Sequence, residues 1–185
     1  MPPHTLAQIQ TIASGVLSNV TADQLTNSTP CDAWNVSQLI DHMVGAQHWA
    51  RAAVEGTEQT ETGEGSSNGD FVSTFNEAAA ASLAAFSEEG ALGRIVNAGM
   101  GDMPAAAILG LAMTDTFVHA WDLAAATGQD TNLDPDLAEQ ILKTARAHTP
   151  DAMRSEDGAV FGFEQPAPDG AGPATQLAAF LGRKV

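Results

Sequence analysis

Hydrophobic residues recur every three to four positions through most of the chain, which is the spacing of amphipathic helices. The first such stretch begins near Thr5. Its apolar face consists of Leu6, Ile9, Ile12, Ala13, Val16 and Leu17. The same spacing predicts a second helix over about 35–55 and a third, with an alanine-rich core face, over about 71–88. A fourth long helix follows and ends at Gly128.

Residues with strong positional preferences mark the ends of these helices. Asn35 is a good N-cap, and Gln38 completes a capping box three residues later. Asp102 can cap the fourth helix and Pro104 can open it. Gly128 suits the position that follows a helix C-terminus. The sequence therefore predicts four long helices with defined starts and stops.

The segments between the helices are rich in turn-forming residues. Residues 21–34 are expected to form a connection, residues 56–70 a mobile loop rich in Gly, Ser and acids, and residues 91–104 a Gly-punctuated connection. The acids of the loop lack the D-x-D-x-D-G pattern of a calcium site, so a solvated loop is the better interpretation. A fifth, shorter helix is predicted over 134–148.

The last part of the chain has two expected pieces. Residues 158–168 should be extended or hairpin-like, and residues 174–183 should form a short closing helix. The sequence has no internal repeat and no alternation of strands with helices. The predicted fold class is therefore all-α, a four-helix bundle. We assign residues 1–150 to the bundle and residues 151–185 to a C-terminal extension packed on it.

Composition and charge narrow the classes of function. The chain has 185 residues, 44% of them hydrophobic, which suits one compact domain. A net charge of −16 and only seven Lys and Arg argue against nucleic acid and anionic membranes as partners. No signal peptide and no membrane span are evident. The single cysteine, Cys31, fits a reducing compartment, so a cytoplasmic protein is expected.

Two polar residues interrupt the apolar face of the fourth helix. Asp115 and His119 are four residues apart, so on a helix they lie one above the other. The rest of that face consists of Ile108, Leu111, Ala112, Leu123 and Ala126. A carboxylate and an imidazole directed into apolar surroundings are costly unless a partner satisfies them.

His42 interrupts the second helix in the same way. It shares a face with Leu39, Ala46, Trp49 and Ala53. Two imidazoles and one carboxylate drawn from two helices form the open three-ligand set that catalytic zinc sites use. We interpret His42, Asp115 and His119 as ligands of a divalent metal, Zn²⁺ in the first place, with Ni²⁺ or Mn²⁺ as alternatives. The competing interpretation is a buried hydrogen-bonded network of these three residues without a metal.

Other residues near the expected site have two interpretations each. Asp122 lies one turn beyond His119, where it can accept a hydrogen bond from a ligating imidazole, or else pair with an arginine or act as a cap. Trp49 is expected to form a wall of the site. Cys31 precedes the helix of His42 and is either a nucleophile or a small buried hydrophobe, since no basic neighbour is evident to lower its pKa.

Three segments of the chain occur in a characteristic order. They are TPCDAWNVSQLIDHMVG, GDMPAAAILGLAMTDTFVHAWDLAAATGQ and the closing FG…LAAFLGR. Their tokens W-x-V-x-x-L-x-x-H and H-x-W-D-L are short, but the order and spacing make the set specific. In these segments the chain resembles the DinB-like superfamily, in the metal-binding branch related to the N-terminal domain of mycothiol-dependent maleylpyruvate isomerase. The resemblance covers nearly the whole chain.

This resemblance implies both a site and a chemistry. It implies a DinB-like four-helix bundle whose divalent metal is held by His42, Asp115 and His119. It also implies a low-molecular-weight thiol, such as mycothiol or bacillithiol, as cosubstrate in thiol transfer to a small electrophile or in its thiol-assisted isomerisation. The alternative is a non-catalytic metal-binding helical bundle in stress response or small-ligand binding. A homodimer is compatible with either function.

Overall fold

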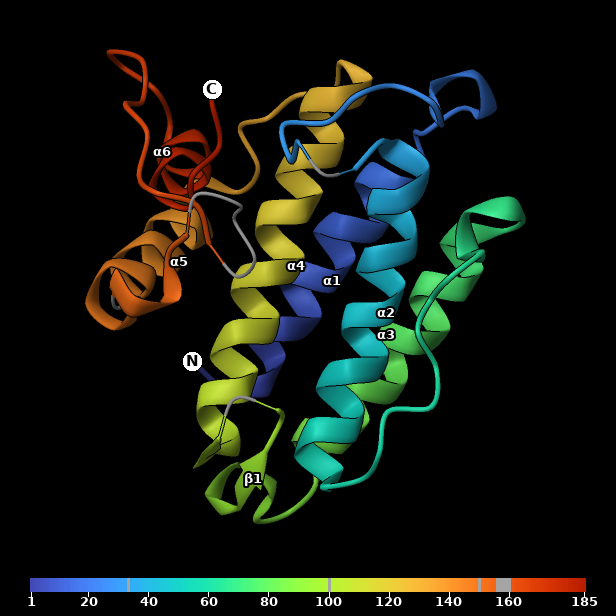
Figure 1. Cartoon of the computed structure of the whole chain (residues 1–185), viewed down its shortest axis with the longest axis vertical. Helices are drawn as coiled ribbons and strands as arrows, with labels where there is room; N and C mark the ends of the chain where they lie inside the picture. The colour runs from blue at the N-terminus through green and yellow to red at the C-terminus, as the bar shows by residue number, and fades with distance from the viewer. Residues whose placement is uncertain (33, 100, 150, 156–160) are drawn as a thin grey trace.

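The computed structural model describes residues 1–32, 34–99, 101–149, 151–155 and 161–185. Four long helices run side by side through the molecule (Figure 1). They are α1 (Pro3–Leu17), α2 (Val36–Glu55), α3 (Phe71–Ser87) and α4 (Ala105–Thr127). Both α1 and α2 pack against α3 and α4. Within the described ranges, no helix is both long and apolar enough to cross a membrane. The predicted all-α four-helix bundle is confirmed.

The ends of α2 and α4 follow their sequence signals. The Asn35 side chain accepts a hydrogen bond from the Gln38 amide at 2.9 Å, and the Gln38 side chain accepts one from the Asn35 amide at 3.1 Å. This reciprocal pair is the predicted capping box. Gly56 ends α2 and Gly128 ends α4, with φ angles of 69° and 71°. Glycine adopts this left-handed conformation without a steric penalty, so both helices stop where a glycine follows.

A small hairpin replaces the predicted connection before α4. Strands β1 (Ile95–Asn97) and β2 (Asp102–Pro104) pair antiparallel, with Val96 opposite Met103. The Asp102 carboxylate accepts a hydrogen bond from Asn97 Nδ2 at 3.0 Å, whereas Pro104 occupies the N-cap position of α4. The prediction that Asp102 caps this helix was therefore wrong. Buried Val96 anchors the hairpin on the core, which draws Asp102 into the strand pair.

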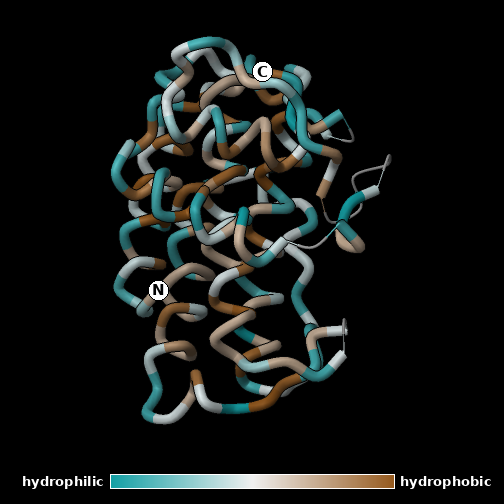
Figure 2. Tube along the Cα trace, turned by 90° about the vertical axis from the view of Figure 1, so that its left-hand side faces the viewer, coloured by the Kyte–Doolittle hydropathy of each residue, from teal (hydrophilic) through white to brown (hydrophobic). Residues whose placement is uncertain are grey.

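Two apolar clusters fill the molecule. One continues from the bundle through α4 to the C-terminal helices and includes Phe117, Ile141 and Leu177. The other is built mainly from the four long helices and includes Leu39 and Phe75. Brown and teal segments alternate along the helices in Figure 2, as expected for helices that each bury one face.

Four buried polar side chains lie together inside the bundle, and we call them the central polar cluster: Gln10, Gln47, Ser82 and Thr116. Gln47 Oε1 accepts hydrogen bonds from Gln10 Nε2 at 3.0 Å and from Ser82 Oγ at 2.9 Å. Gln47 Nε2 donates to Thr116 Oγ1 at 2.9 Å. All four long helices contribute one residue, so the cluster fixes how they face one another. The sequence pattern did not reveal it.

The remaining helices lie beside α4. Helices α5 (Pro135–His148) and α6 (Pro173–Phe180) pack against each other, and α6 also contacts α4 (Figure 1). Both match predicted helices. Part of the expected hairpin, 158–160, lies outside the described residues, and residues 161–168 contain a single isolated bridge, from Phe161 to Arg154, instead of a strand pair. Single 3₁₀ turns occur at Ala22–Gln24, Ser66–Asn68, Ala91–Gly93 and Asp151–Met153. The domain boundary at residue 150 stays a prediction.

Candidate metal centre

The structure brings together the three residues that sequence analysis selected as metal ligands. His42 comes from α2, while Asp115 and His119 come from successive turns of α4. The Nε2 atoms of His42 and His119 lie 3.3 Å and 3.4 Å from Asp115 Oδ1. One potential ligand atom from each residue lies within 4.8 Å of the other two. Residues 73 positions apart in the chain thus form one candidate metal group.

The donor atoms of this group are poorly satisfied by protein alone. Asp115 Oδ2 is buried and has no hydrogen-bond partner among the described residues, although 32% of the whole side chain is exposed. An unpaired buried polar atom costs roughly 1–3 kcal/mol, and more when the group is charged. Two imidazole nitrogens and a carboxylate are also the donor types that divalent zinc prefers. The residues present therefore fit a divalent metal.

The pKa values of the group show how its charges depend on one another. Burial is the largest single influence on the pKa of Asp115 and would raise it, but His119 and His42 together hold this pKa well below its usual range. Burial would lower the pKa of His119, but Asp115 and Asp122 outweigh burial and raise it. Without a metal, a proton on His119 therefore partly compensates the carboxylates.

Asp122 orients His119 from behind. Its carboxylate is fully buried and lies 2.9 Å from His119 Nδ1. Arg183 donates to the same carboxylate through Nη2 at 2.9 Å and Nε at 3.2 Å. Because an ionised carboxylate only accepts hydrogen bonds, His119 donates through Nδ1, which leaves Nε2 as the ring nitrogen for a ligand. Asp122 thus has two of the roles predicted for it at once: it accepts a hydrogen bond from the His119 imidazole and it pairs with an arginine.

Arg183 is the functional residue that sequence reasoning missed. Burial, the largest single influence, would lower its pKa, but Asp122 outweighs it and raises the pKa. The pKa of Asp122 is correspondingly lowered, although burial alone would raise it. A sequence signal did exist. Asp122 is a buried-face acid in a chain with only seven Lys and Arg, and one of these seven, Arg183, ends the predicted apolar helix over 174–183.

Two glycines bring Arg183 to this position. Gly182 has a φ of 100°, and a Cβ atom there would lie 2.5 Å from the Gly162 Cα. Arg154 reinforces the contact, since its Nη1 donates to the carbonyls of Gly162 and Phe180, each at 2.8 Å. The guanidinium of Arg154 also lies 4.5 Å from the centroid of the Phe180 ring. The residues after α6 are therefore held against the segment that begins at residue 161.

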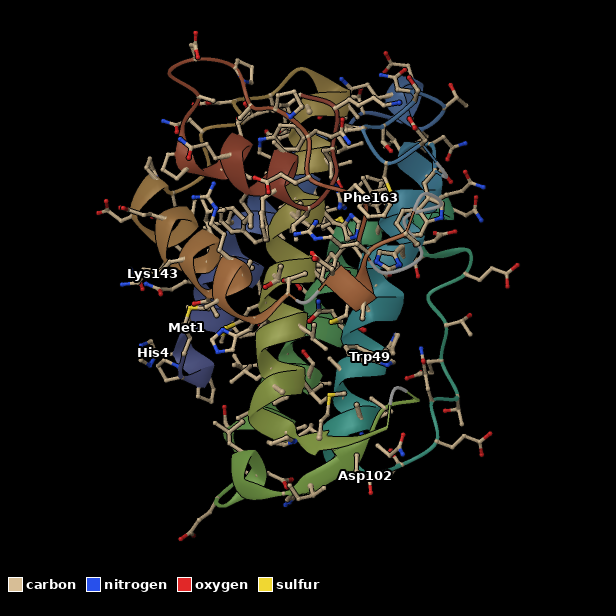
Figure 3. The ribbon with its side chains drawn as sticks, turned by 60° about the vertical axis from the view of Figure 1, so that its left-hand side comes forward. Met1, His4, Trp49, Asp102, Lys143 and Phe163 are labelled. Atoms are coloured by element: carbon tan, nitrogen blue, oxygen red, sulfur yellow. The ribbon has the colours of Figure 1, made fainter. Side chains whose placement is uncertain are left out.

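A cavity of about 430 Å³ opens onto the metal group. Its apolar lining includes Trp34, Trp49, Leu111 and Phe161. The indole of Trp34 stacks on the His42 ring, with centroids 4.3 Å apart and planes inclined by 25°. Trp49, expected as a site wall, is part of this lining, and Figure 3 shows it on the flank of α2. The volume is in the range of small-molecule sites.

The acidic loop forms another wall of the cavity, through Gln59 and Thr62. It passes so close to α2 that a Cβ on Gly45 would lie 2.2 Å from the Thr62 carbonyl oxygen. The Asp41 carboxylate also accepts hydrogen bonds from two loop amides, Gly65 at 3.1 Å and Ser67 at 2.7 Å. The segment is a loop, as predicted. These hydrogen bonds and the close approach to α2 hold it against the bundle, which is not expected of a freely mobile loop.

Cys31 lies in the same cavity but outside the metal group. It is partly buried and belongs to the cavity lining, as Trp34 and Arg183 do. The described His, Cys, Asp and Glu residues yield only the group of His42, Asp115 and His119 as a potential metal cluster. Cys31 is thus a residue of the cavity wall.

Comparison with known proteins shows which family and which proteins the chain is similar to. Residues 6–124, which reach from α1 into α4, match the family described as the mycothiol maleylpyruvate isomerase N-terminal domain. Two uncharacterized proteins of Mycobacterium tuberculosis, from strains CDC 1551 / Oshkosh and ATCC 25618 / H37Rv, are each 39% identical over 176 residues, covering 93% of this chain and 92% of the relative. No solved structure matches the chain. The chain therefore belongs to the mycothiol maleylpyruvate isomerase N-terminal domain family, with its DinB-like fold.

Proposed function

We propose that this protein is a metal-dependent enzyme that transfers a low-molecular-weight thiol to a small electrophile or uses the thiol to isomerise it. One observation carries the proposal: Asp115 Oδ2 is buried without a hydrogen-bond partner among the described residues, beside two imidazole Nε2 atoms. The description of the family, a mycothiol-dependent isomerase domain, supports a thiol such as mycothiol or bacillithiol. The proposed setting is a reducing cytoplasm.

The proposed cofactor is Zn²⁺, with Ni²⁺ and Mn²⁺ as alternatives. His42 and His119 would hold it through Nε2 and Asp115 through its carboxylate. When bound, such a metal acts as a Lewis acid that lowers the pKa of a coordinating thiol and makes it nucleophilic at neutral pH. Imidazole and carboxylate donors suit all three of these metals, so the donor set alone does not select among them.

The residues of the chain would orient the two imidazoles and surround the bound substrate. Asp122 fixes the tautomer and angle of His119 through the 2.9 Å contact with Nδ1, and Arg183 keeps Asp122 ionised and in place. Trp34 restricts the rotation of His42 by stacking on its ring. The cavity would replace part of the water around a bound electrophile with apolar side chains, which strengthens electrostatic interactions inside it.

A specific observation favours a second candidate, a non-catalytic metal-binding bundle. Among the described residues that line the cavity, the titratable side chains outside the metal group are Cys31 and Arg183. Arg183 is committed to Asp122, so it is a poor proton donor or acceptor. Any reaction in this cavity must then take its acid–base groups from Cys31, the metal group, the thiol or solvent.

The experiment that separates the two candidates measures consumption of an electrophile. Purified protein loaded with one equivalent of Zn²⁺ is mixed with a reactive aromatic chloride, with and without a low-molecular-weight thiol. We expect thiol-dependent consumption well above the thiol-only rate, and no such gain with His42→Ala. A rate equal to the thiol-only background, with the metal bound, would leave the metal-binding bundle as the function.

A further inference from the structure

We propose that the cavity selects a substrate with an uncharged, flat and largely apolar body, and rejects one that carries a carboxylate away from the metal group. The proposal deepens the function proposed above and rests on it for the role of the metal. It assigns the substrate class by the distribution of apolar surface and positive charge around the cavity.

The apolar part of the lining comes from three parts of the chain. Trp34 precedes α2, Trp49 lies on α2, Leu111 lies on α4 one turn before Asp115, and Phe161 belongs to the C-terminal segment. Two indoles and a phenyl ring offer flat faces, which bury a planar ligand with little loss of side-chain entropy. The metal group belongs to the same lining, so one polar atom of the ligand has a place to bind while the rest meets apolar surface.

Positive charge is nearly absent from the same lining. Arg183 is its only described cation, and the buried carboxylate of Asp122 neutralises it through two donors. Its third nitrogen, Nη1, donates to the Leu181 carbonyl at 3.1 Å. A second carboxylate on a ligand would therefore find, among the described residues of the wall, only a guanidinium whose charge Asp122 already balances.

None of the other six Lys and Arg residues belongs to the described lining of the cavity. Arg51 pairs with Glu55, and Arg94 pairs with Glu88. Arg154 is bound to backbone carbonyls and a phenyl ring in the tail, as described above.

The last three cations are Lys143, Arg146 and Lys184. Lys143 and Arg146 belong to α5, and Figure 3 shows Lys143 on the side of the molecule away from Trp49. Lys184 is 81% exposed and lies 3.8 Å from Asp32. The eight residues outside the described ranges include no Lys or Arg. An anionic substrate body is therefore disfavoured by the composition of the chain as well as by its fold.

The test uses aromatic hydroxamates, whose hydroxamate binds zinc while the ring carries the variable group. The probes are benzohydroxamate, its 4-methyl derivative and its 4-carboxylate derivative, titrated into zinc-loaded protein by calorimetry and by tryptophan fluorescence. We expect the 4-methyl probe to bind at least as tightly as the parent. The 4-carboxylate probe should bind at least ~10-fold more weakly, because its charge loses water without gaining a cation.

A matched pair of variants on the exposed loop wall checks the cause. Thr62→Lys places a cation at the cavity and should reduce the penalty of the 4-carboxylate probe at least ~3-fold, whereas Thr62→Met should not. Binding of the 4-carboxylate probe within twofold of the parent in the unaltered protein would overturn the selectivity but leave the metal function standing. Failure of the protein to hold zinc at His42, Asp115 and His119 would overturn both proposals.

Discussion

The bundle contains two polar clusters that differ in how their buried polar atoms are satisfied. In the central polar cluster, amides and hydroxyls pair with one another, and Gln47 uses both ends of its side chain. In the metal group, Asp115 and two histidines meet, yet Asp115 Oδ2 has no partner among the described residues. The first cluster is closed by all four long helices, whereas the second opens onto a cavity.

The difference lies in the chemistry of the side chains. Amides carry donors and acceptors together, so a group of them can satisfy itself. An ionised carboxylate has only acceptors, and His119 offers a lone pair at Nε2 once Nδ1 donates to Asp122. Acceptors that converge on one point need a positive charge, either protons or a metal ion. A self-satisfied cluster therefore indicates a structural role, and a convergent acceptor set indicates a ligand.

The largest expected effect follows from removing one acceptor of the metal group. His42→Ala or His119→Ala should lower the affinity for Zn²⁺ by at least ~100-fold, because each removes one of the three proposed ligands. Competition with a chromophoric chelator measures this affinity. Asp115→Asn should weaken binding less, since the amide oxygen can still coordinate. Metal retained at full affinity in both His variants would contradict the assignment of the site.

The contacts behind His119 should give the next largest effect. Asp122→Asn should lower the affinity for Zn²⁺ by roughly 10–100-fold, because loss of such an orienting partner has this typical effect. Arg183→Ala should in addition lower the free energy of unfolding by about 3–5 kcal/mol, since it removes the guanidinium of a buried ion pair and leaves His119 as the remaining described partner of the Asp122 carboxylate. Chelator competition and urea unfolding are the two measurements, and Arg183→Lys is the conservative control. Unchanged affinity in Asp122→Asn would show that the contact is only structural.

Disruption of the central polar cluster should affect stability alone. Gln47→Leu removes its shared partner, so the free energy of unfolding should fall by about 1–3 kcal/mol. The affinity for Zn²⁺ should stay within about twofold of the unaltered protein, because no hydrogen bond among the described residues joins the cluster to the metal group. Thermal unfolding and metal titration of one preparation test both halves. A large loss of affinity would erase the distinction between the two clusters.

The smallest expected effect is a pH dependence of the metal-free protein. The pKa of His119 is raised by Asp115 and Asp122 against the opposing influence of burial. Protonated His119 therefore stabilises the metal-free fold below about pH 6.5, the usual His value, and this contribution is lost as the pH rises through the raised pKa.

Metal binding should reverse this dependence, because zinc competes with the same proton. Calorimetry at pH 7 in buffers with different ionisation enthalpies should show release of roughly one proton per zinc bound. The metal-loaded protein should lose its metal on acidification. Zinc affinity independent of pH between about 5 and 7 would contradict imidazole ligation.

The sequence predicted the helices, whose apolar residues recur at helical spacing, and the polar residues that interrupt this spacing. The helix ends at Asn35 and Gly128 follow from local preferences, and the three proposed ligands interrupt apolar faces. The hairpin at 95–104 was missed because three-residue strands are too short to show periodicity. Gln47 was missed because a glutamine on a helix is usually exposed, and its partners lie on other helices.

Arg183 shows a different kind of limit. It lies 61 positions from Asp122 along the chain, and it reaches that carboxylate only after the turn at Gly182. Neither the distance nor the turn leaves a periodic pattern in the sequence. Contacts of this kind depend on how segments pack after the helices have formed, which local propensity does not determine.

The contact between Arg183 and Asp122 also links two equilibria. Because the guanidinium rests on the carboxylate that orients His119, α6 cannot separate from α4 without disturbing the metal group. By thermodynamic reciprocity, whatever occupies that group must make the opening of α6 less favourable by the same free energy by which that opening weakens its binding. The exchange rate of the α6 backbone amides with solvent deuterium is therefore a remote gauge of metal occupancy. It can be followed without any substrate and without a probe in the cavity.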